Sequence, residues 1–182
     1  MKRMILFVVA SLTLFLTVSA QGMEAGGSRK TVRHSGDVVS VVLPAAGATA
    51  LLLYKDGEGL KQAALAGATT LAATILLKQT VKKERPDGTD NQSFPSRHAA
   101  VAFAAATFLQ QRYGWTWGAP ALTAATYISW TRVYGKKHDV WDVAAGAAIG
   151  AGSSFLFTRR FAREHRLTLC PTANGIYASL QF

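Results

Sequence analysis

Cysteine and acidic residues are both scarce in this chain of 182 residues. The single cysteine, Cys170, excludes an intramolecular disulfide and a cysteine-rich zinc site, so redox chemistry and thiolate metal binding are not expected. Charged residues make up only 16% of the chain, but 20 Lys and Arg against 10 Asp and Glu give a formal net charge of +10. This balance predicts an anionic partner, such as nucleic acid, anionic lipid or a phosphate ester.

The N-terminal segment has the pattern of an export signal. Lys2 and Arg3 precede an apolar run, and the small residues before Gln21 suit a signal peptidase, so residues 1–20 are expected to be a signal peptide or a first membrane helix. Both alternatives place Gln21 outside the cytoplasm. Residues 21–37 are rich in glycine and basic side chains, which predicts a flexible lead-in.

The middle of the chain, residues 38–165, predicts an all-α bundle of about five helices. Its apolar stretches are rich in Ala, Leu and Gly and lack the alternation of strands. They are Val38 to Tyr54, Gln62 to Leu77, His98 to Leu109, Trp115 to Trp130, and Val140 to Phe157. We expect the bundle to be embedded in a membrane, although several stretches are short and the mean hydropathy of +0.16 leaves a water-soluble bundle open.

The tail, residues 166–182, changes character. Leu167 to Leu169 and Ile176 to Phe182 alternate between apolar and polar residues, and Asn174-Gly175 is a favourable pair for a type I′ turn. The pattern predicts a small C-terminal β-hairpin.

Two basic segments follow apolar stretches and suit an oxyanion. Residues 78–86 include Lys78 and Arg85, an ammonium and a two-pronged guanidinium, although a solvated basic helix end has the same composition. In the segment Pro95-Ser96-Arg97-His98, Ser96 is a natural N-cap, so the free amides of the next turn form an anion seat toward which His98 projects.

A third segment, residues 131–142, contains Arg132, His138 and Asp142. His138 and Asp142 are four residues apart, which places them on one face of a helix, where the carboxylate can fix the imidazole tautomer and free the other nitrogen to attack or to take a proton. An ordinary ion pair at a helix start is the alternative. An alternating helix path brings all three segments to the same end of the bundle, so we expect them to form one phosphate site.

These residues resemble the signature of the type 2 phosphatidic acid phosphatase superfamily, which also includes bacterial class A acid phosphatases and vanadium haloperoxidases. The signature is KxxxxxxRP, then PSGH, then SRxxxxxHxxxD, and the match spans Lys78 to Asp142. Two positions depart from it: Arg97 replaces Gly, which either crowds the phosphate turn or adds a cation, and Thr131 replaces Ser.

The resemblance implies a role for each matched residue. His138 would attack phosphorus to give a phosphohistidine, Asp142 would orient it, and His98 would protonate the leaving oxygen and then help to activate water. The phosphate oxygens would be held by Lys78, Arg85, Ser96 and Arg132, with Arg97 as a further candidate. The scheme requires no metal and no cofactor.

The leading hypothesis is a phosphatase acting on a lipid phosphate or diphosphate, with no nucleic-acid partner, in the bacterial inner membrane with its active site facing the periplasm. A soluble periplasmic acid phosphatase and a non-catalytic anion-binding envelope protein are the alternatives. The short chain makes a haloperoxidase a poor fit.

Overall fold

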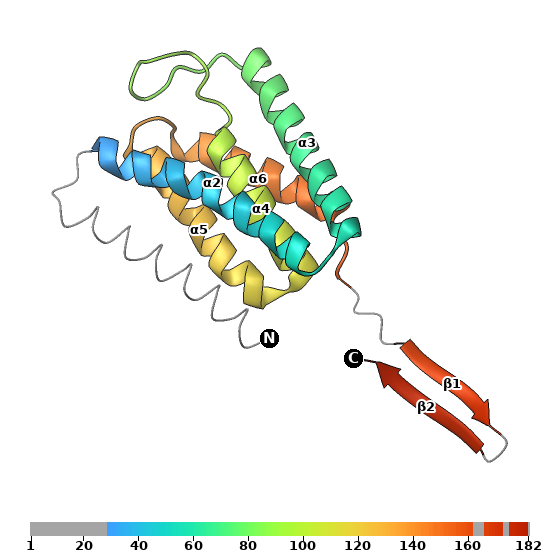
Figure 1. The fold of residues 1–182 in the computed structure, drawn as a ribbon. Helices are drawn as coiled ribbons and strands as arrows, with labels where there is room; N and C mark the ends of the chain where they lie inside the picture. The colour runs from blue at the N-terminus through green and yellow to red at the C-terminus, as the bar shows by residue number, and fades with distance from the viewer. Residues whose placement is uncertain (1–28, 162–165, 173–174, 182) are drawn as a thin grey trace.

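The computed structural model describes residues 29–161, 166–172 and 175–181, and helices dominate it (Figure 1). Within these residues the elements, in chain order, are α2 (Arg29–Leu53), α3 (Gly57–Thr80), α4 (Arg97–Tyr113), α5 (Trp115–Tyr134), α6 (Val140–Phe157), β1 (Arg166–Thr172) and β2 (Gly175–Gln181). The predicted five-helix bundle is confirmed. The predicted signal segment, residues 1–20, lies outside the described residues.

Helix α4 is the centre of the bundle and contacts α2, α3, α5 and α6. Its buried face is built mainly from alanines, which allow neighbouring backbones to approach closely. Gly146 and Gly150 lie one above the other on the facing side of α6, where an added Cβ would collide with the carbonyl oxygens of Ser96 and Ala100. The start of α6 is therefore held directly against the start of α4.

Helix α2 begins at Arg29, so residues 29–37, which the sequence led us to expect in a flexible lead-in, are helical. The reason is a tight contact with α5. An added Cβ on Gly36 would collide with the Thr131 side chain, and the carbonyl of Arg33 accepts a hydrogen bond from Arg132 Nη2 at 2.6 Å. Gly36 thus serves close packing here rather than flexibility.

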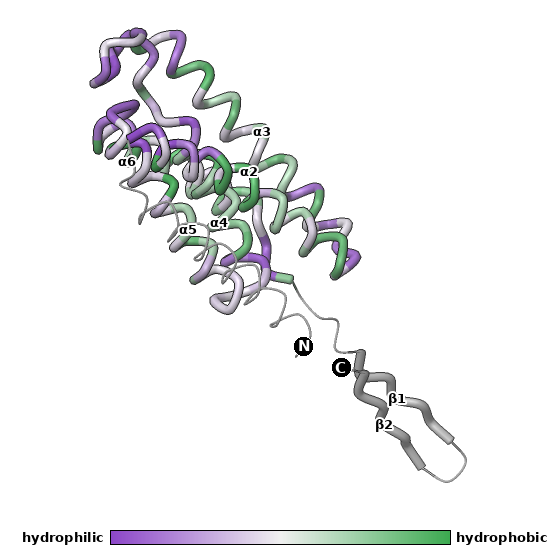
Figure 2. Tube along the Cα trace, turned by 60° about the vertical axis from the view of Figure 1, so that its left-hand side comes forward, coloured by the Kyte–Doolittle hydropathy of each residue, from purple (hydrophilic) through white to green (hydrophobic). Residues whose placement is uncertain are grey.

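Three of the helices in the described part of the chain, α2, α3 and α6, are long and apolar enough to cross a membrane. Helix α3 buries mostly small or polar residues and exposes large apolar ones, including Leu65 and Leu76 at 53% and 62%. In Figure 2 hydrophilic residues gather toward the ends of the bundle, with more apolar segments between them. This distribution suits a bundle in a lipid bilayer.

The C-terminal hairpin is also present. Strands β1 and β2 pair antiparallel from Arg166 opposite Gln181 to Thr172 opposite Gly175, and this register leaves a two-residue connection. The register places Gly175 in β2, opposite Thr172, so the prediction of Asn174-Gly175 as the central pair of the turn is wrong. The connection itself, residues 173–174, lies outside the described residues.

A buried ion pair holds together the end of the bundle at which α3 begins and α4 ends. Asp56 is the N-cap of α3, and both of its carboxylate oxygens accept from Arg112 of α4, at 2.7 and 2.5 Å. Tyr113 donates to the same carboxylate, and Arg112 Nη1 donates to the carbonyl of Arg159 after α6. These contacts therefore join α3, α4 and the end of α6 at one point.

We expect Arg112→Ala to lower the free energy of unfolding by about 3–5 kcal/mol, because it leaves a buried carboxylate without its cation. Denaturant unfolding in detergent measures this. Lys61→Ala is the matched control, since the Lys61–Glu58 pair is exposed and 3.9 Å apart and should contribute less than about 1 kcal/mol. Equal losses of unfolding free energy in the two variants would show that the buried pair stabilises the fold no more than the exposed pair does.

Candidate active site

Two loops meet at one end of the bundle (Figure 1). They join α3 to α4 and α5 to α6, over residues 81–96 and 135–139. Ser96 N donates to the carbonyl of Asp142 at 2.9 Å, and Arg85 Nη1 donates to the carbonyl of Lys137 at 3.4 Å. The structure therefore brings together all three segments that the sequence singled out.

His138 and Asp142 face one another in the interior, with 4% and 0% of their side chains exposed. Asp142 is in the first turn of α6, where its carboxylate accepts from the backbone amide of Asp139 at 3.0 Å in a reciprocal capping box. His138 Nδ1 lies 3.6 Å from Asp142 Oδ2 and has no hydrogen-bond partner within the described residues. The imidazole is thus beside the carboxylate, slightly beyond hydrogen-bond distance.

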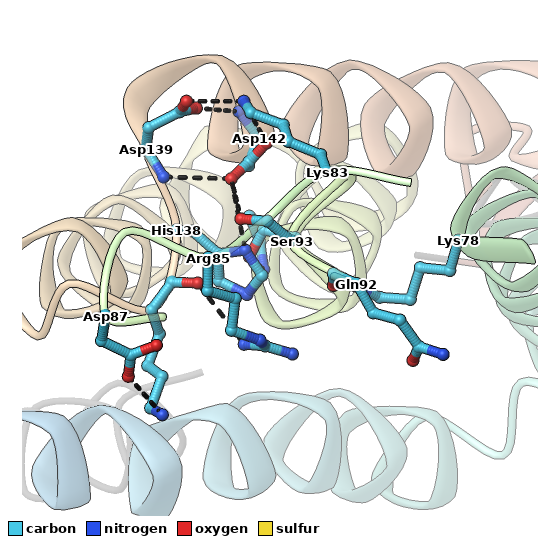
Figure 3. Close-up of polar contacts among 12 residues, drawn as sticks. Lys78, Lys83, Arg85, Asp87, Gln92, Ser93, His138, Asp139 and Asp142 are labelled. Atoms are coloured by element: carbon cyan, nitrogen blue, oxygen red, sulfur yellow. Dashed lines mark hydrogen bonds and ion pairs between the residues drawn. The ribbon is translucent and has the colours of Figure 1, made fainter. Parts of the chain in front are cut away.

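Two residues that the sequence analysis missed form hydrogen bonds with the Asp142 carboxylate (Figure 3). The buried hydroxyl of Ser93 donates to Asp142 Oδ2 in a very short hydrogen bond, and Lys83 Nζ contacts Asp142 Oδ1 at 2.8 Å and Asp139 Oδ2 at 2.5 Å. Burial alone would lower the pKa of Lys83, but these two hydrogen bonds outweigh it and raise the pKa. Lys83 is therefore a permanent cation that holds Asp142 in place.

We expect Lys83→Met to lower kcat by about 10- to 100-fold with little change in KM, because it removes a charge-assisted hydrogen bond that positions Asp142 without touching the substrate. Steady-state phosphate release measures both constants. Lys82→Met is the matched control, because Lys82 is the exposed neighbour. Lys83→Arg should restore part of kcat. A rise in KM with unchanged kcat would instead mean that Lys83 binds substrate.

His98 lies in the first turn of α4, after Ser96, whose side chain accepts from Ala99 N at 3.5 Å. Its Nε2 is 3.3 Å from Asp37 Oδ1 of α2, and the same oxygen accepts from Arg132 Nη1 at 2.6 Å. Asp37 is the third site residue that the sequence analysis missed, because it was assigned to the lead-in. Arg132 is 3% exposed and reaches the site in contact with this carboxylate.

The remaining cations surround the two imidazoles. Lys78, near the end of α3, donates to the carbonyl of Gln92 at 2.6 Å, and Arg85 Nε donates to Asp90 at 2.8 Å. Arg97 is exposed at the start of α4, where it takes an ordinary helical backbone. The replacement of the signature glycine therefore causes no strain in the turn, and Arg97 adds a positive charge near His98.

Both histidines are held neutral. Burial, with the positive charges of Arg132, Arg97 and Arg85, lowers the pKa of His98 to about 4, although Asp37 opposes this. Burial, with the charges of Arg85 and Lys78, lowers the pKa of His138 to about 4 as well. Arg85 is among the positive charges that lower the pKa of both imidazoles. At neutral pH each ring therefore carries a lone pair.

We expect NMR titration of the free protein to show both imidazoles titrating near pH 4, more than two units below an ordinary histidine. Bound phosphate should raise both pKa values, because its negative charge offsets the surrounding cations. Titration of His98 and His138 near pH 6.5 would show that the surrounding cations do not hold them neutral.

This arrangement can support phosphoryl transfer. A neutral imidazole beside a carboxylate is a nucleophile or a base, and the surrounding Lys and Arg side chains suit the charge on phosphate oxygens. In the described part of the chain, no three His, Cys, Asp or Glu side chains converge as metal ligands, so we assign none of them to a metal.

Comparisons with known proteins agree with this chemistry. The model of the PAP2 superfamily matches residues 59–166. Lipid A 4′-phosphatase of Helicobacter pylori is 31% identical over 137 residues, which cover 69% of each protein. Lipid A 1-phosphatase of Porphyromonas gingivalis is 38% identical over 77 residues, 40% of this chain but only 17% of that protein.

The fold is also similar to a solved structure. The crystal structure of Aquifex aeolicus LpxE superposes with a TM-score of 0.59 at 23% sequence identity, over 80% of this chain and 92% of the other. The range of the family match contains every signature position from Lys78 to Asp142. The resemblance seen in the sequence is thereby confirmed: the chain belongs to the PAP2 superfamily and is a phosphatase.

Proposed function

We propose that this protein hydrolyses a phosphorylated membrane lipid through a phosphohistidine on His138. The observation that carries the proposal is that the hydrogen bonds from Ser96 N to the carbonyl of Asp142 and from Arg85 to the carbonyl of Lys137 bring the basic segment, half-buried His98 and buried His138 to one end of the bundle. Phosphoryl transfer needs a nucleophile, an acid and cations for the equatorial oxygens, and the site offers each of them.

In the first step, the Nε2 lone pair of His138 attacks phosphorus while the bond to the leaving oxygen breaks. Asp142 faces Nδ1 and stabilises the positive charge that develops on the ring. The 3.6 Å separation needs to shorten only slightly for a hydrogen bond, as is common when substrate tightens an open site. Lys78, Arg85, Arg97 and Arg132, with the Ser96 hydroxyl and nearby amides, surround the phosphate oxygens.

His98 supplies the proton for the leaving oxygen. Its pKa of about 4 in the free protein rises when a phosphate dianion binds beside it, so the ring becomes protonated in the complex. In the second step, neutral His98 takes a proton from water as the water attacks phosphorus. The phosphorus–nitrogen bond then breaks, and phosphate leaves with His138 restored.

A lipid is the substrate class that the molecule favours. Helices α2, α3 and α6 suit a bilayer, and the site lies at one end of the bundle, where a headgroup would be. The relatives from Helicobacter pylori and Porphyromonas gingivalis carry the names of lipid A phosphatases, so the phosphates of lipid A are the first substrates to test.

The periplasmic face is the proposed side for the site. Asp37, near the start of α2, contacts His98, so α2 enters the bundle at the site end. An N-terminal export signal of the predicted kind would leave the segment before α2 outside the cytoplasm. The site would then be on the same side.

The test is phosphate release by purified protein in phosphatidylcholine vesicles from lipid A, phosphatidic acid, an isoprenoid diphosphate and p-nitrophenyl phosphate. We expect one lipid to be hydrolysed with a much higher kcat/KM than p-nitrophenyl phosphate. If the protein could be extracted from cells without detergent and showed no preference for lipid substrates, a soluble acid phosphatase would be favoured instead. Absence of release from every substrate would favour the anion-binding role.

A further inference from the structure

We propose that an apolar groove between α2 and α3 binds an acyl chain of the lipid substrate; this inference rests on the proposed lipid phosphatase function. The groove has a volume of about 250 Å³ and lies over α4. Leu60 and Leu71 of α3 form part of its wall and are 57% and 42% exposed, so it is accessible from outside the bundle.

The lining of the groove is apolar. Its polar side chains are Thr70 and Ser154, whose hydroxyls donate to the carbonyls of Ala66 and Ala104 at 2.8 and 2.7 Å. No donor on these side chains is left to hold water, and an ordered water needs two to four polar partners. The groove therefore suits a hydrocarbon occupant.

The helices that line the groove also carry residues of the catalytic site. On α4, the lining begins at Val101, about one turn beyond His98. On α3, Leu71 precedes Lys78 by about two turns, which is roughly 10 Å along the axis. The groove thus begins within roughly 5–10 Å of the phosphate site along the helix axes and runs away from it to Leu60 and Phe108, near the other end of the bundle.

This alignment selects the substrate's own acyl chain as the occupant. In a phosphorylated lipid, a short polar linker separates the phosphate from the hydrocarbon, and the 5–10 Å interval between site and groove accommodates such a linker. Helices α2 and α3 are also candidate membrane spans, so the groove lies at the depth of lipid tails.

Two glycines make a direct test possible. Gly47 of α2 and Gly67 of α3 line the groove from opposite walls, and a Cβ added at either would meet no atom within 4 Å. Gly47→Leu and Gly67→Leu should therefore fill the groove without a collision of their first carbon with the protein. Gly152→Leu is the matched control, because Gly152 of α6 has equally open space but is outside the groove.

The assay compares dipalmitoyl phosphatidic acid in phosphatidylcholine vesicles with soluble p-nitrophenyl phosphate; if lipid A is the only lipid hydrolysed, it replaces phosphatidic acid. We expect each groove variant to lower kcat/KM for the lipid about tenfold or more, the loss expected when two or more methylene groups lose their burial. Activity on p-nitrophenyl phosphate should stay within twofold, and Gly152→Leu should leave both activities unchanged.

Several outcomes would overturn the inference. Unchanged lipid activity in both groove variants, an equal loss in Gly152→Leu, or a parallel loss of both activities would each do so. A parallel loss, or an altered oligomeric state, would mean that protein fills the groove, either another segment of this chain or a second copy. The failure of the proposed function is distinguishable, because wild-type protein would then hydrolyse no lipid phosphate, with or without activity on p-nitrophenyl phosphate.

Discussion

His138→Ala is expected to lower phosphate release by about 10⁴-fold or more. The side chain supplies the nitrogen that bonds to phosphorus, and removing a nucleophile leaves only the residual rate that binding and charge stabilisation can support. The carboxylate of Asp142 keeps its hydrogen bonds from Ser93, Lys83 and the Asp139 amide in this variant, so the site should keep its shape. Phosphate release from the best lipid substrate measures the loss.

The matched control is His34→Ala, which removes a histidine that is exposed on α2. It should retain nearly the full rate. Comparable rates for His138→Ala and wild type would remove the nucleophile assignment, and with it the phosphohistidine mechanism.

His98→Ala is expected to lower the rate on a lipid phosphate by about 10²- to 10⁴-fold, the range found when a general acid is removed. The alkoxide of a lipid is a poor leaving group and needs a proton, whereas p-nitrophenolate leaves without one. With p-nitrophenyl phosphate, the variant should therefore form the phosphoenzyme quickly and hydrolyse it slowly, because water activation also depends on His98.

Rapid mixing with p-nitrophenyl phosphate tests this role. A burst of about one p-nitrophenol per active site, followed by a slow steady state, is the expected result. A slow reaction without a burst would mean that His98 contributes to formation of the phosphoenzyme in some way other than proton donation.

The sequence was sufficient to predict the helical bundle and the convergence of the segments that carry the candidate site. Five apolar stretches rich in small residues predicted five helices, and the spacing from Lys78 to Asp142 predicted which loops converge. Both predictions depend on local patterns along the chain. The close packing of α6 on α4 at Gly146 and Gly150 then fixes where the start of α6 lies relative to the start of α4.

Asp37, Lys83 and Ser93 were missed because their roles depend on contacts between distant segments. Asp37 acts through Arg132 and His98, which are far from it along the chain, and its surroundings appeared flexible. Lys83 is one of two adjacent lysines, and no local pattern distinguishes it from exposed Lys82. Only the approach of the α3–α4 loop to the start of α6 brings Lys83 and Ser93 to Asp142.

Arg97 is the opposite case. The sequence analysis identified it as a departure from the signature, but only the structure shows its effect. Its signature equivalent is glycine, so the sequence left two alternatives open: Arg97 crowds the phosphate turn, or it adds a cation. The residue instead takes a helical conformation directly after Ser96, and its charge contributes to the lowered pKa of His98. A side chain at this position therefore strengthens the positive field of the site.

The most direct test of the mechanism is to trap the phosphoenzyme. Protein mixed for milliseconds with ³²P-labelled substrate and quenched in alkali, where phosphohistidine is stable, should carry label on the peptide that contains His138. The label should be lost in acid and absent from His138→Ala. Label on another residue, or no labelled protein during rapid turnover, would contradict a mechanism through His138.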